Sequence, residues 1–340
     1  MPAEWEVHSG THLNWPTNRS TWPGKRMELV EKVYVDIIKT LSKYETVYLL
    51  VPDGQYRRHA EQILLAGNVN LTKVVFHVVP TNDVWSRDCG PIFVQNPAGT
   101  YAITDWKYNA WGGKYSPYDD DDKLPEYFSR MYGIERFPVD MVLEGGSIDT
   151  NGNRLMITTE SVLLNPNRNP GMMKSQIEQN LYDYLGQEKI IWLKRGLAGD
   201  DTDGHVDDLC RFVNETTVVA TATDNPDDVN YAALQENLEI LAKATDQNGR
   251  SLTIETLPLP ETRIEGTTVD GSEYVPASYT NFYIANDVVL MPFYDERYDA
   301  QAQALLQNHF LDREVIGIPC ADLVWGQGSI HCITQQLYGT

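Results

Sequence analysis

A recurring order of secondary-structure signals constrains the fold of this 340-residue chain more than any other feature. At four places, two short apolar, β-rich segments enclose a polar turn, which is typical of β-hairpins. These pairs lie within residues 92–103, 147–157, 211–220 and 282–290. An amphipathic helix and a buried strand follow most of the hairpins. The sequence therefore predicts one supersecondary unit that is used several times.

The helices of this unit are predicted from apolar residues at helical spacing, such as Met27, Val30, Val33, Ile37 and Leu41. We expect helices near residues 26–44, 56–66, 122–132, 172–186, 228–246 and 296–310, and strands at 189–193, 252–257 and 315–318. The unit recurs roughly every 60 to 70 residues, and such units must stack to bury their apolar faces. This favours a closed ring of α/β blades over a doubly wound sheet. In such a ring, ligands bind where the blades converge.

The charge of the chain limits its partners. It has 48 acidic and 27 basic residues, a net charge of -21, which disfavours nucleic-acid and anionic-membrane partners because both bind basic surface. The acidic excess favours solubility or a field that attracts small cations, and both interpretations stay open. No linker or low-complexity tract divides the sequence, so we expect one catalytic domain over residues 1–340. Whether it forms a homo-oligomer is left open.

Targeting signals and cysteine spacing point to a cytoplasmic protein. The first residues contain neither a basic nor an apolar leader region, and no apolar run is as long as a membrane span. The four cysteines show no disulfide or zinc-site spacing, so we expect reduced thiols.

Cys332 is the first candidate catalytic group. It follows the turn Gly326-Gln327-Gly328-Ser329 and precedes a short apolar strand. A glycine-rich turn that leads into a strand can present a nucleophile at a defined place. The alternative is a core thiol, because cysteine is among the most often buried residues. His331 alternates away from Cys332 along the strand, so we do not expect the two to pair.

Two earlier segments contain the groups that such a thiol would need. Asp88 lies just before the first hairpin and could act in a site or simply pair with Arg87. In the acidic segment 199–208, alternation along a strand would put His205 and Asp207 on one face. Glu144 precedes two glycines and is either an exposed strand-edge residue or a buried group that orients an imidazole.

Metal binding is disfavoured. Asp201-x-Asp203-Gly204 resembles part of a calcium loop, but the remaining ligands of such a loop are missing. Zinc would need a second His or Cys at ligand spacing. We therefore expect neither a metal nor an organic cofactor.

Five segments resemble the agmatine deiminases in the same order. This family is a branch of the guanidine-modifying (pentein) superfamily, which also holds the Porphyromonas-type peptidylarginine deiminases. The likeness covers effectively the whole chain and is strongest at residues 82–94, 105–113, 144–147, 204–208 and 328–336. It implies a five-bladed pseudosymmetric α/β propeller, in agreement with the repeated unit.

The resemblance also implies roles for single residues. Cys332 would be the nucleophile and His205 the general acid/base, with Glu144 as the partner of His205. Asp88 and Asp207 would hold the guanidinium group. The chain departs from its relatives at Gln327 and Ser329, where they commonly have glycine and asparagine, and at Asp201 and Asp203, where many have glutamate and asparagine.

The function implied is hydrolysis of agmatine, a small cationic guanidine, to N-carbamoylputrescine and ammonia. Asp201 is the candidate for the distal ammonium, with Trp85 as an aromatic wall. One alternative is deimination of free or peptidyl arginine, although an acidic chain is poorly suited to the α-carboxylate of arginine. The others are a Cys-His amidase, which would need an oxyanion hole, and a calcium-binding interaction protein.

Overall fold

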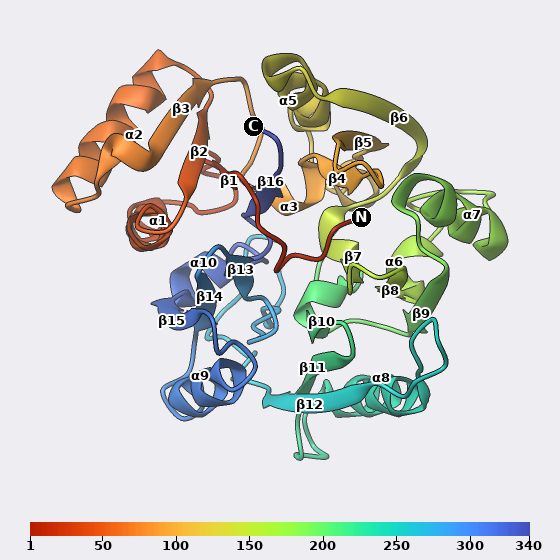
Figure 1. The fold of residues 1–340 in the computed structure, drawn as a ribbon. Helices are drawn as coiled ribbons and strands as arrows, with labels where there is room; N and C mark the ends of the chain where they lie inside the picture. The colour runs from red at the N-terminus through yellow and green to blue at the C-terminus, as the bar shows by residue number, and fades with distance from the viewer.

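The computed structural model describes residues 1–340, which fold into five small sheets arranged in a ring (Figure 1). One sheet has four strands, in the order β16 (Gln335–Leu337), β1 (Gly10–Asn14), β2 (Thr46–Val51) and β3 (Val74–Val78). The other four have three strands each, in chain order: β4 (Ile92–Gln95), β5 (Tyr101–Lys107) and β6 (Glu135–Val142); β7 (Ile148–Thr150), β8 (Leu155–Thr159) and β9 (Lys189–Leu193); β10 (Cys210–Asn214), β11 (Thr217–Ala222) and β12 (Thr253–Pro258); β13 (Tyr283–Ala285), β14 (Val288–Phe293) and β15 (Glu314–Pro319). The α/β propeller predicted from the repeat is confirmed.

Each three-stranded sheet consists of an antiparallel hairpin and a parallel third strand. In the first, Ile92 pairs with Thr104 across the hairpin, and Ile103 pairs with Arg136 in the parallel register. A helix connects the second strand to the third, because parallel neighbours need a crossover. These helices are α5 (Leu124–Tyr132), α7 (Lys174–Leu185), α8 (Tyr231–Lys243) and α9 (Asp299–Gln307). All four predicted hairpins and the helix predicted after each are confirmed.

The four-stranded sheet closes the ring by joining the two ends of the chain. β16 pairs with β1 in antiparallel register, with Gly10 opposite Leu337. β1 also pairs in parallel with β2, and helices α1 (Arg26–Leu41) and α2 (Gly54–Ala66) connect the remaining strands of this sheet. The predicted helices at 26–44 and 56–66 are therefore confirmed. The pairing of β1 with β16 was not predicted.

The largest apolar cluster lies where this closing sheet meets its neighbours. It includes Leu13 of β1, Tyr34 of α1 and Leu49 of β2, together with Ile333, all without exposed surface. Cys332 belongs to the same cluster. The turn before β16 is therefore anchored in the core.

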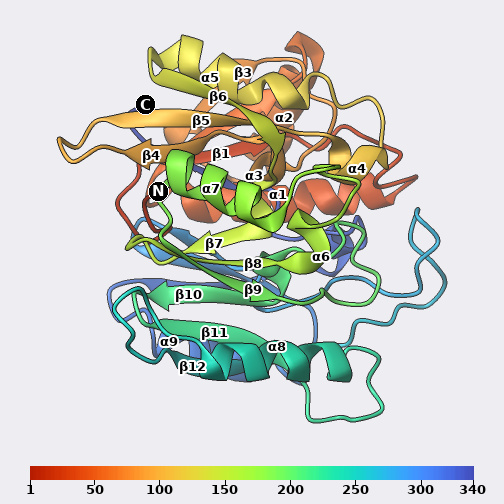
Figure 2. The same ribbon diagram turned by 90° about the vertical axis from the view of Figure 1, so that its right-hand side faces the viewer.

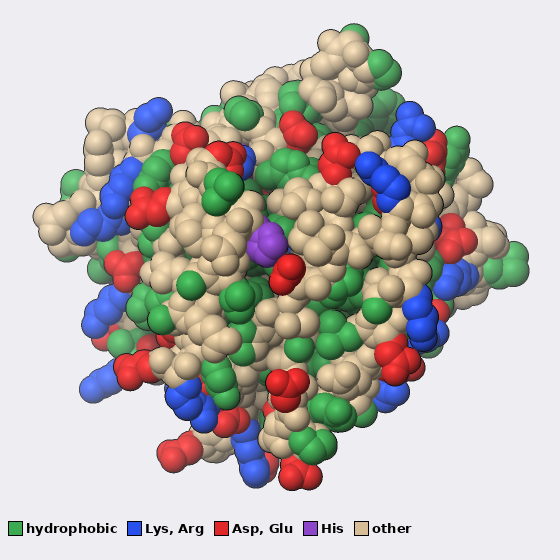
Figure 3. Space-filling model, turned by 60° about the horizontal axis from the view of Figure 1, so that its bottom comes forward, with side chains coloured by type: hydrophobic (Ala, Val, Ile, Leu, Met, Phe, Trp, Pro, Cys, Tyr) green, Lys and Arg blue, Asp and Glu red, His purple; other side chains and the backbone are tan.

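The surface shows how the acidic excess is distributed. On the face drawn in Figure 3, acidic and basic side chains are intermixed. None of the helices has the length and apolar character that crossing a bilayer would require.

Candidate active site

The candidate residues lie in short segments that precede the first strand of successive sheets. Asp88 is in α3 (Ser86–Cys89) before β4, Glu144 adjoins the 3-10 helix η3 (Gly145–Ser147) before β7, and Asp207 is in the 3-10 helix η4 (Val206–Asp208) before β10. Cys332 occupies the turn before β16. Because these segments have equivalent places in the repeated unit, the ring brings them together.

Gly146 is the point at which three of the candidate side chains meet. A Cβ atom added there would lie 2.6 Å from His205 Nδ1, 2.7 Å from Asp88 Oδ1 and 3.1 Å from Asp207 Oδ2. Any side chain would therefore displace the two carboxylates or the imidazole, and only glycine permits this approach. The structure thus brings together His205, Asp88 and Asp207, as the sequence predicted.

The predicted reason for that proximity was wrong in one respect. Residues 206–208 form the 3-10 helix η4 and not a strand, so side-chain alternation does not place His205 beside Asp207. The tight turn brings both residues towards Gly146 instead.

The Cys332 thiol is 4% exposed and lies among carboxylates. Its Sγ is 3.2 Å from Asn281 Nδ2 and 3.9 Å from Asp207 Oδ2. Burial, together with the negative charges of Asp207, Asp208 and Asp88, raises the pKa of the Cys332 thiol well above its usual range. Without a cation in the site, this cysteine therefore retains its proton.

Asp88 and His205 form the second part of the site. Asp88 Oδ1 lies 3.6 Å from His205 Nδ1 and accepts a hydrogen bond from Gly146 N at 3.0 Å, while Oδ2 accepts one from Trp111 Nε1 at 3.0 Å. Burial and the neighbouring carboxylates raise the pKa of Asp88 to about 6, although His205 opposes this. Burial alone would lower the pKa of His205, but the carboxylates around it, Asp88 first, raise it. Both ring nitrogens of His205 are buried without a hydrogen-bond partner.

The two carboxylate oxygens of Asp207 differ in their contacts. Its Oδ2 lies 2.6 Å from His331 Nδ1, whereas its Oδ1 is buried without a partner. Burial would raise the pKa of Asp207, but the hydrogen bond and positive charge of His331 lower it overall. One oxygen of this buried carboxylate thus has no hydrogen-bond partner.

His331 connects Asp207 to the N-terminal segment. His331 Nε2 lies 2.8 Å from Glu4 Oε2, and the carboxylate of Glu4 also pairs with Arg87 at 3.1 Å and Arg211 at 2.9 Å. Figure 1 shows the N-terminal segment crossing the centre of the ring. His331 has no hydrogen bond to Cys332, but the two residues lie in a turn and not in the strand that the prediction assumed. The pairing of His331 with Asp207 and the role of Glu4 were missed. These contacts join residues that are far apart in the sequence, and no local sequence pattern predicts them.

Glu144 is fully buried, but its hydrogen bond goes to another residue than expected. Its Oε1 accepts from Arg168 Nε at 2.5 Å, and its Oε2 has no partner. The structure has no direct hydrogen bond between Glu144 and His205, and the role of Glu144 as the partner of His205 stays a prediction. Glu144 is nevertheless among the charges that raise the pKa of His205. Arg168, which sequence reasoning missed, also pairs with Asp203 Oδ2 at 2.7 Å.

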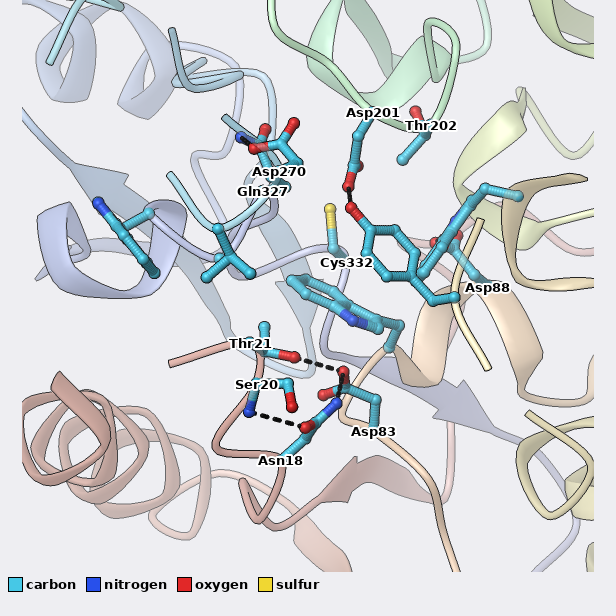
Figure 4. A pocket seen from close by; sticks show the side chains of 16 residues that line it. Asn18, Ser20, Thr21, Asp83, Asp88, Asp201, Thr202, Asp270, Gln327 and Cys332 are labelled. Carbon is cyan, nitrogen blue, oxygen red and sulfur yellow. Dashed lines mark hydrogen bonds between the residues drawn. The ribbon is translucent and has the colours of Figure 1, made fainter. Parts of the chain in front are cut away.

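A cavity of about 120 Å³ opens beside these groups (Figure 4). Cys332 and Asp88 border it, together with Trp85, Trp111 and Asp201. Trp85 packs edge-on against Trp111 with ring centroids 6.1 Å apart. A Cβ on Gly328 would lie 2.3 Å from the Trp85 ring, so this glycine allows the turn before Cys332 to approach the ring closely.

Asp201 borders the same cavity, as expected for a residue that contacts the ligand. Its Oδ2 accepts a hydrogen bond from the Tyr115 hydroxyl at 2.6 Å. Burial raises the pKa of Asp201 to about 7, with the nearby Asp200 and Asp270 adding to the effect. The structure thus places an acidic side chain in the wall of the cavity that Cys332 also borders.

One group of side chains could approach a metal ion. Ligand atoms of Asp207, Asp208 and Cys332 lie within 4.8 Å of one another. Calcium takes six to eight oxygen ligands and structural zinc usually four nitrogen or sulfur ligands, so the group matches neither preference closely.

Comparisons with known proteins identify the relatives of this chain. The family model for Porphyromonas-type peptidyl-arginine deiminase matches residues 1–337. An agmatine deiminase of Pseudomonas aeruginosa (strain LESB58) is 37% identical over 354 residues, covering 99% of this chain and 94% of that protein. The resemblance inferred from the five sequence segments is confirmed.

Solved structures agree with this result. The agmatine deiminase of Enterococcus faecalis superposes with a TM-score of 0.91 at 33% identity, covering 99% of this chain and 95% of that one. The C. jejuni agmatine deiminase with substrate bound gives a TM-score of 0.87 at 29% identity, with coverage of 99% and 95%. An amidinotransferase from Microseira wollei, at 11% identity and a TM-score of 0.55, shares the fold.

Proposed function

The chain belongs to the Porphyromonas-type peptidyl-arginine deiminase family, and we propose that it hydrolyses agmatine to N-carbamoylputrescine and ammonia through a covalent intermediate on Cys332. One observation carries the proposal. Cys332 and Asp88 border one cavity, and Asp88 meets the buried carboxylate of Asp207 and the imidazole of His205 around Gly146. This set of groups suits attack on a planar cationic carbon.

Substrate binding would use the two carboxylates. A guanidinium group donates paired N–H bonds to carboxylates, and Asp207 Oδ1 is a buried acceptor without a partner. Asp88 offers a second carboxylate at the cavity. The cation would compensate the repulsion between these negative charges, which is unfavourable while the site is empty.

The same cation would activate the nucleophile. The reacting species of a cysteine is the thiolate, and a nearby positive charge lowers the pKa of a thiol. The carboxylates that keep Cys332 protonated in the empty site would be neutralised by the guanidinium. The thiol would release its proton to solvent as the guanidinium binds, so formation of the thiolate would be coupled to arrival of the correct substrate.

His205 would carry protons in both halves of the reaction. The thiolate attacks the central guanidinium carbon and forms a tetrahedral adduct. His205 then protonates the departing nitrogen, the C–N bond breaks, and ammonia leaves a covalent thiouronium. The imidazole next takes a proton from water, whose oxygen attacks the same carbon. Cleavage of the C–S bond releases the ureido product and restores the cysteine.

The acidic wall of the cavity favours agmatine over arginine. Agmatine has an ammonium group at the end where arginine has an α-amino and an α-carboxylate group. Asp201 would attract the ammonium and repel the carboxylate. Lys114 is a cation near Asp201, but its Nζ already pairs with Asp203 Oδ1 at 2.8 Å. It is therefore poorly placed to compensate a substrate carboxylate.

Release of ammonia from three substrates tests the proposal. Purified enzyme would be assayed with agmatine, arginine and a peptide that ends in arginine. We expect kcat/KM to be highest for agmatine. Preference for either arginine substrate would contradict the substrate assignment, and no ammonia from any of them would contradict the reaction.

A further inference from the structure

The loop between β12 and β13 contributes to the cavity through residues that sequence reasoning did not consider. Residues 262–275, here called the strap, fold back on themselves through hydrogen bonds from Ile264 N to Glu273 O at 3.0 Å and from Val275 N to Thr262 O at 2.9 Å. Figure 2 shows the strap projecting at the right of the molecule. Near its tip, Val269 and Asp270 border the cavity that Cys332 also borders.

Gln327 connects the strap to the turn that carries the nucleophile. Its Nε2 lies 3.1 Å from Thr268 Oγ1, 3.3 Å from Asp270 Oδ1 and 3.5 Å from Tyr274 O, all of them strap atoms. Gln327 also borders the cavity, and its Oε1 is buried without a hydrogen-bond donor. The amide nitrogen thus binds the strap, and the amide oxygen has no hydrogen-bond donor.

The backbone at Gln327 indicates that the side chain serves a purpose. Its φ is 78°, in the left-handed region that glycine adopts without strain and other residues adopt at a cost. Strained backbone of this kind tends to occur at functional sites. Glutamine occupies this position although glycine would fit the turn better, so the amide is the feature to explain.

Asp270 is an acidic group without a cationic partner. It accepts hydrogen bonds from the Thr268 hydroxyl, from Ser272 N at 3.4 Å and from Gln327, and it forms no salt bridge. Figure 4 shows Asp270 and Gln327 on the same side of Cys332 as Asp201. Asp83, a further acidic residue of the cavity, lies on the other side of Cys332 in that view.

We propose that Gln327 and Asp270 determine substrate specificity by binding, together with Asp201, the second cationic group of the substrate. A primary ammonium has three N–H donors. Asp201, Asp270 and Gln327 each offer it an acceptor, two of them negatively charged. This inference rests on the proposed function and assigns the residues that would bind the far end of its substrate. It also links recognition of that ammonium to the turn that presents Cys332.

The test compares agmatine with n-pentylguanidine, in which a methyl group replaces the ammonium. Gln327→Gly removes the amide and suits the left-handed backbone, and Asp270→Asn removes the charge. In each variant we expect the ratio of kcat/KM for agmatine to that for n-pentylguanidine to fall about tenfold, because a hydrogen bond to a charged group is lost. The fall should come from a higher KM for agmatine. Glu265→Gln, which neutralises an exposed acid elsewhere on the strap, should keep the wild-type ratio.

The possible failures are distinguishable. If the wild-type enzyme processes both guanidines but the ratio is unchanged in Gln327→Gly and Asp270→Asn, the inference is wrong and the proposed function stands. An equal loss of kcat for both substrates would also overturn it, because Gln327 would then act only on the shape of the nucleophile turn. If the wild-type enzyme releases ammonia from neither guanidine, the proposed function fails and the inference with it.

Discussion

His331 Nδ1 lies 2.6 Å from Asp207 Oδ2, so the residue next to the candidate nucleophile supports a carboxylate from a different blade. The other ring nitrogen is 2.8 Å from Glu4 Oε2. A neutral imidazole can donate only one N–H, whereas the protonated ring donates to both carboxylates. The buried network around these contacts also contains the cations Arg87 and Arg211 and the carboxylate of Asp149.

That network predicts a remote effect of Glu4. Burial opposes its ionisation, but Arg211, His331 and Arg87 hold the pKa of Glu4 well below its usual range. Glu4→Gln would leave buried cations uncompensated and weaken the hold of His331 on Asp207. We expect a loss of about 3 kcal/mol in the free energy of unfolding and an increase of about tenfold in KM for agmatine. Urea unfolding and steady-state kinetics check this, with exposed Glu6→Gln as the control. A wild-type KM in Glu4→Gln would contradict the support of Asp207 by this route.

Cys332→Ser should abolish turnover, whereas alanine replacements of Cys89, Cys210 and Cys320 should retain much of it. Because the thiol pKa is raised, the proton is held at neutral pH and is lost only as the pH rises above the usual range for cysteine. Alkylation of Cys332 by iodoacetamide in the free enzyme should therefore be slow at neutral pH and accelerate well into the alkaline range. Mass spectrometry of the modified peptide measures this. Rapid labelling at neutral pH, or inactivation with Cys332 unmodified, would contradict the assignment.

Asp88 should contribute to the acidic limb of the pH profile, at a lower pH than Asp201, whose pKa is about 7. Its pKa is raised to about 6, so the carboxylate is protonated below that pH and can no longer bind the cation as an anion. We expect kcat/KM for agmatine to decrease as the pH falls through about 6, because kcat/KM reports ionisations of the free enzyme. Bound substrate favours the ionised form, so the decrease in kcat should occur at lower pH. A profile for kcat/KM that stays flat to about one unit below that pKa would speak against this role.

Asp201 should govern the preference for agmatine. We expect the wild-type kcat/KM for agmatine to exceed that for arginine by at least about 10²-fold. Asp201→Asn should raise the KM for agmatine and narrow this preference, with less effect on kcat. Kinetics with both substrates measure the change, and exposed Asp224→Asn serves as the control. Asp201 has no part in selectivity if its variant keeps the wild-type preference.

Activity should survive exhaustive dialysis against EDTA, because the proposed chemistry uses only side chains and water. Ammonia release from agmatine before and after dialysis is the measurement. Loss of activity that zinc or calcium restores would instead favour a metal site at Asp207, Asp208 and Cys332.

Local features of the fold were predictable, and distant contacts were not. The hairpin at 92–103 and the helix at 172–186 are encoded by turn residues and apolar spacing within each segment, so both were found. The pairing of β1 with β16 joins strands at opposite ends of the chain, and no local pattern encodes it. That residues 1–340 form one catalytic domain stays a prediction.

In the site, too, residues in recognisable local segments were predictable, and contacts between distant residues were not. Asp88, His205, Asp207 and Cys332 were found because they lie in segments that resemble the family, and the structure brings them together. Their catalytic roles stay predictions. Glu4, Arg168 and His331 were missed because their importance lies in contacts with distant residues. The strand predicted at His205–Asp207 was wrong because a short polar segment cannot by itself distinguish a strand from a tight turn.

The pairing of β1 with β16 has a consequence for the biosynthesis of this protein. During translation β1 leaves the ribosome long before β16, and the strand that follows the Cys332 turn can pair only after both have been made. The nascent chain can form the middle blades first, because their hairpins and helices are local in sequence. The enzyme would then become active in a single late step. Incomplete chains would be partly folded but would not react with guanidines.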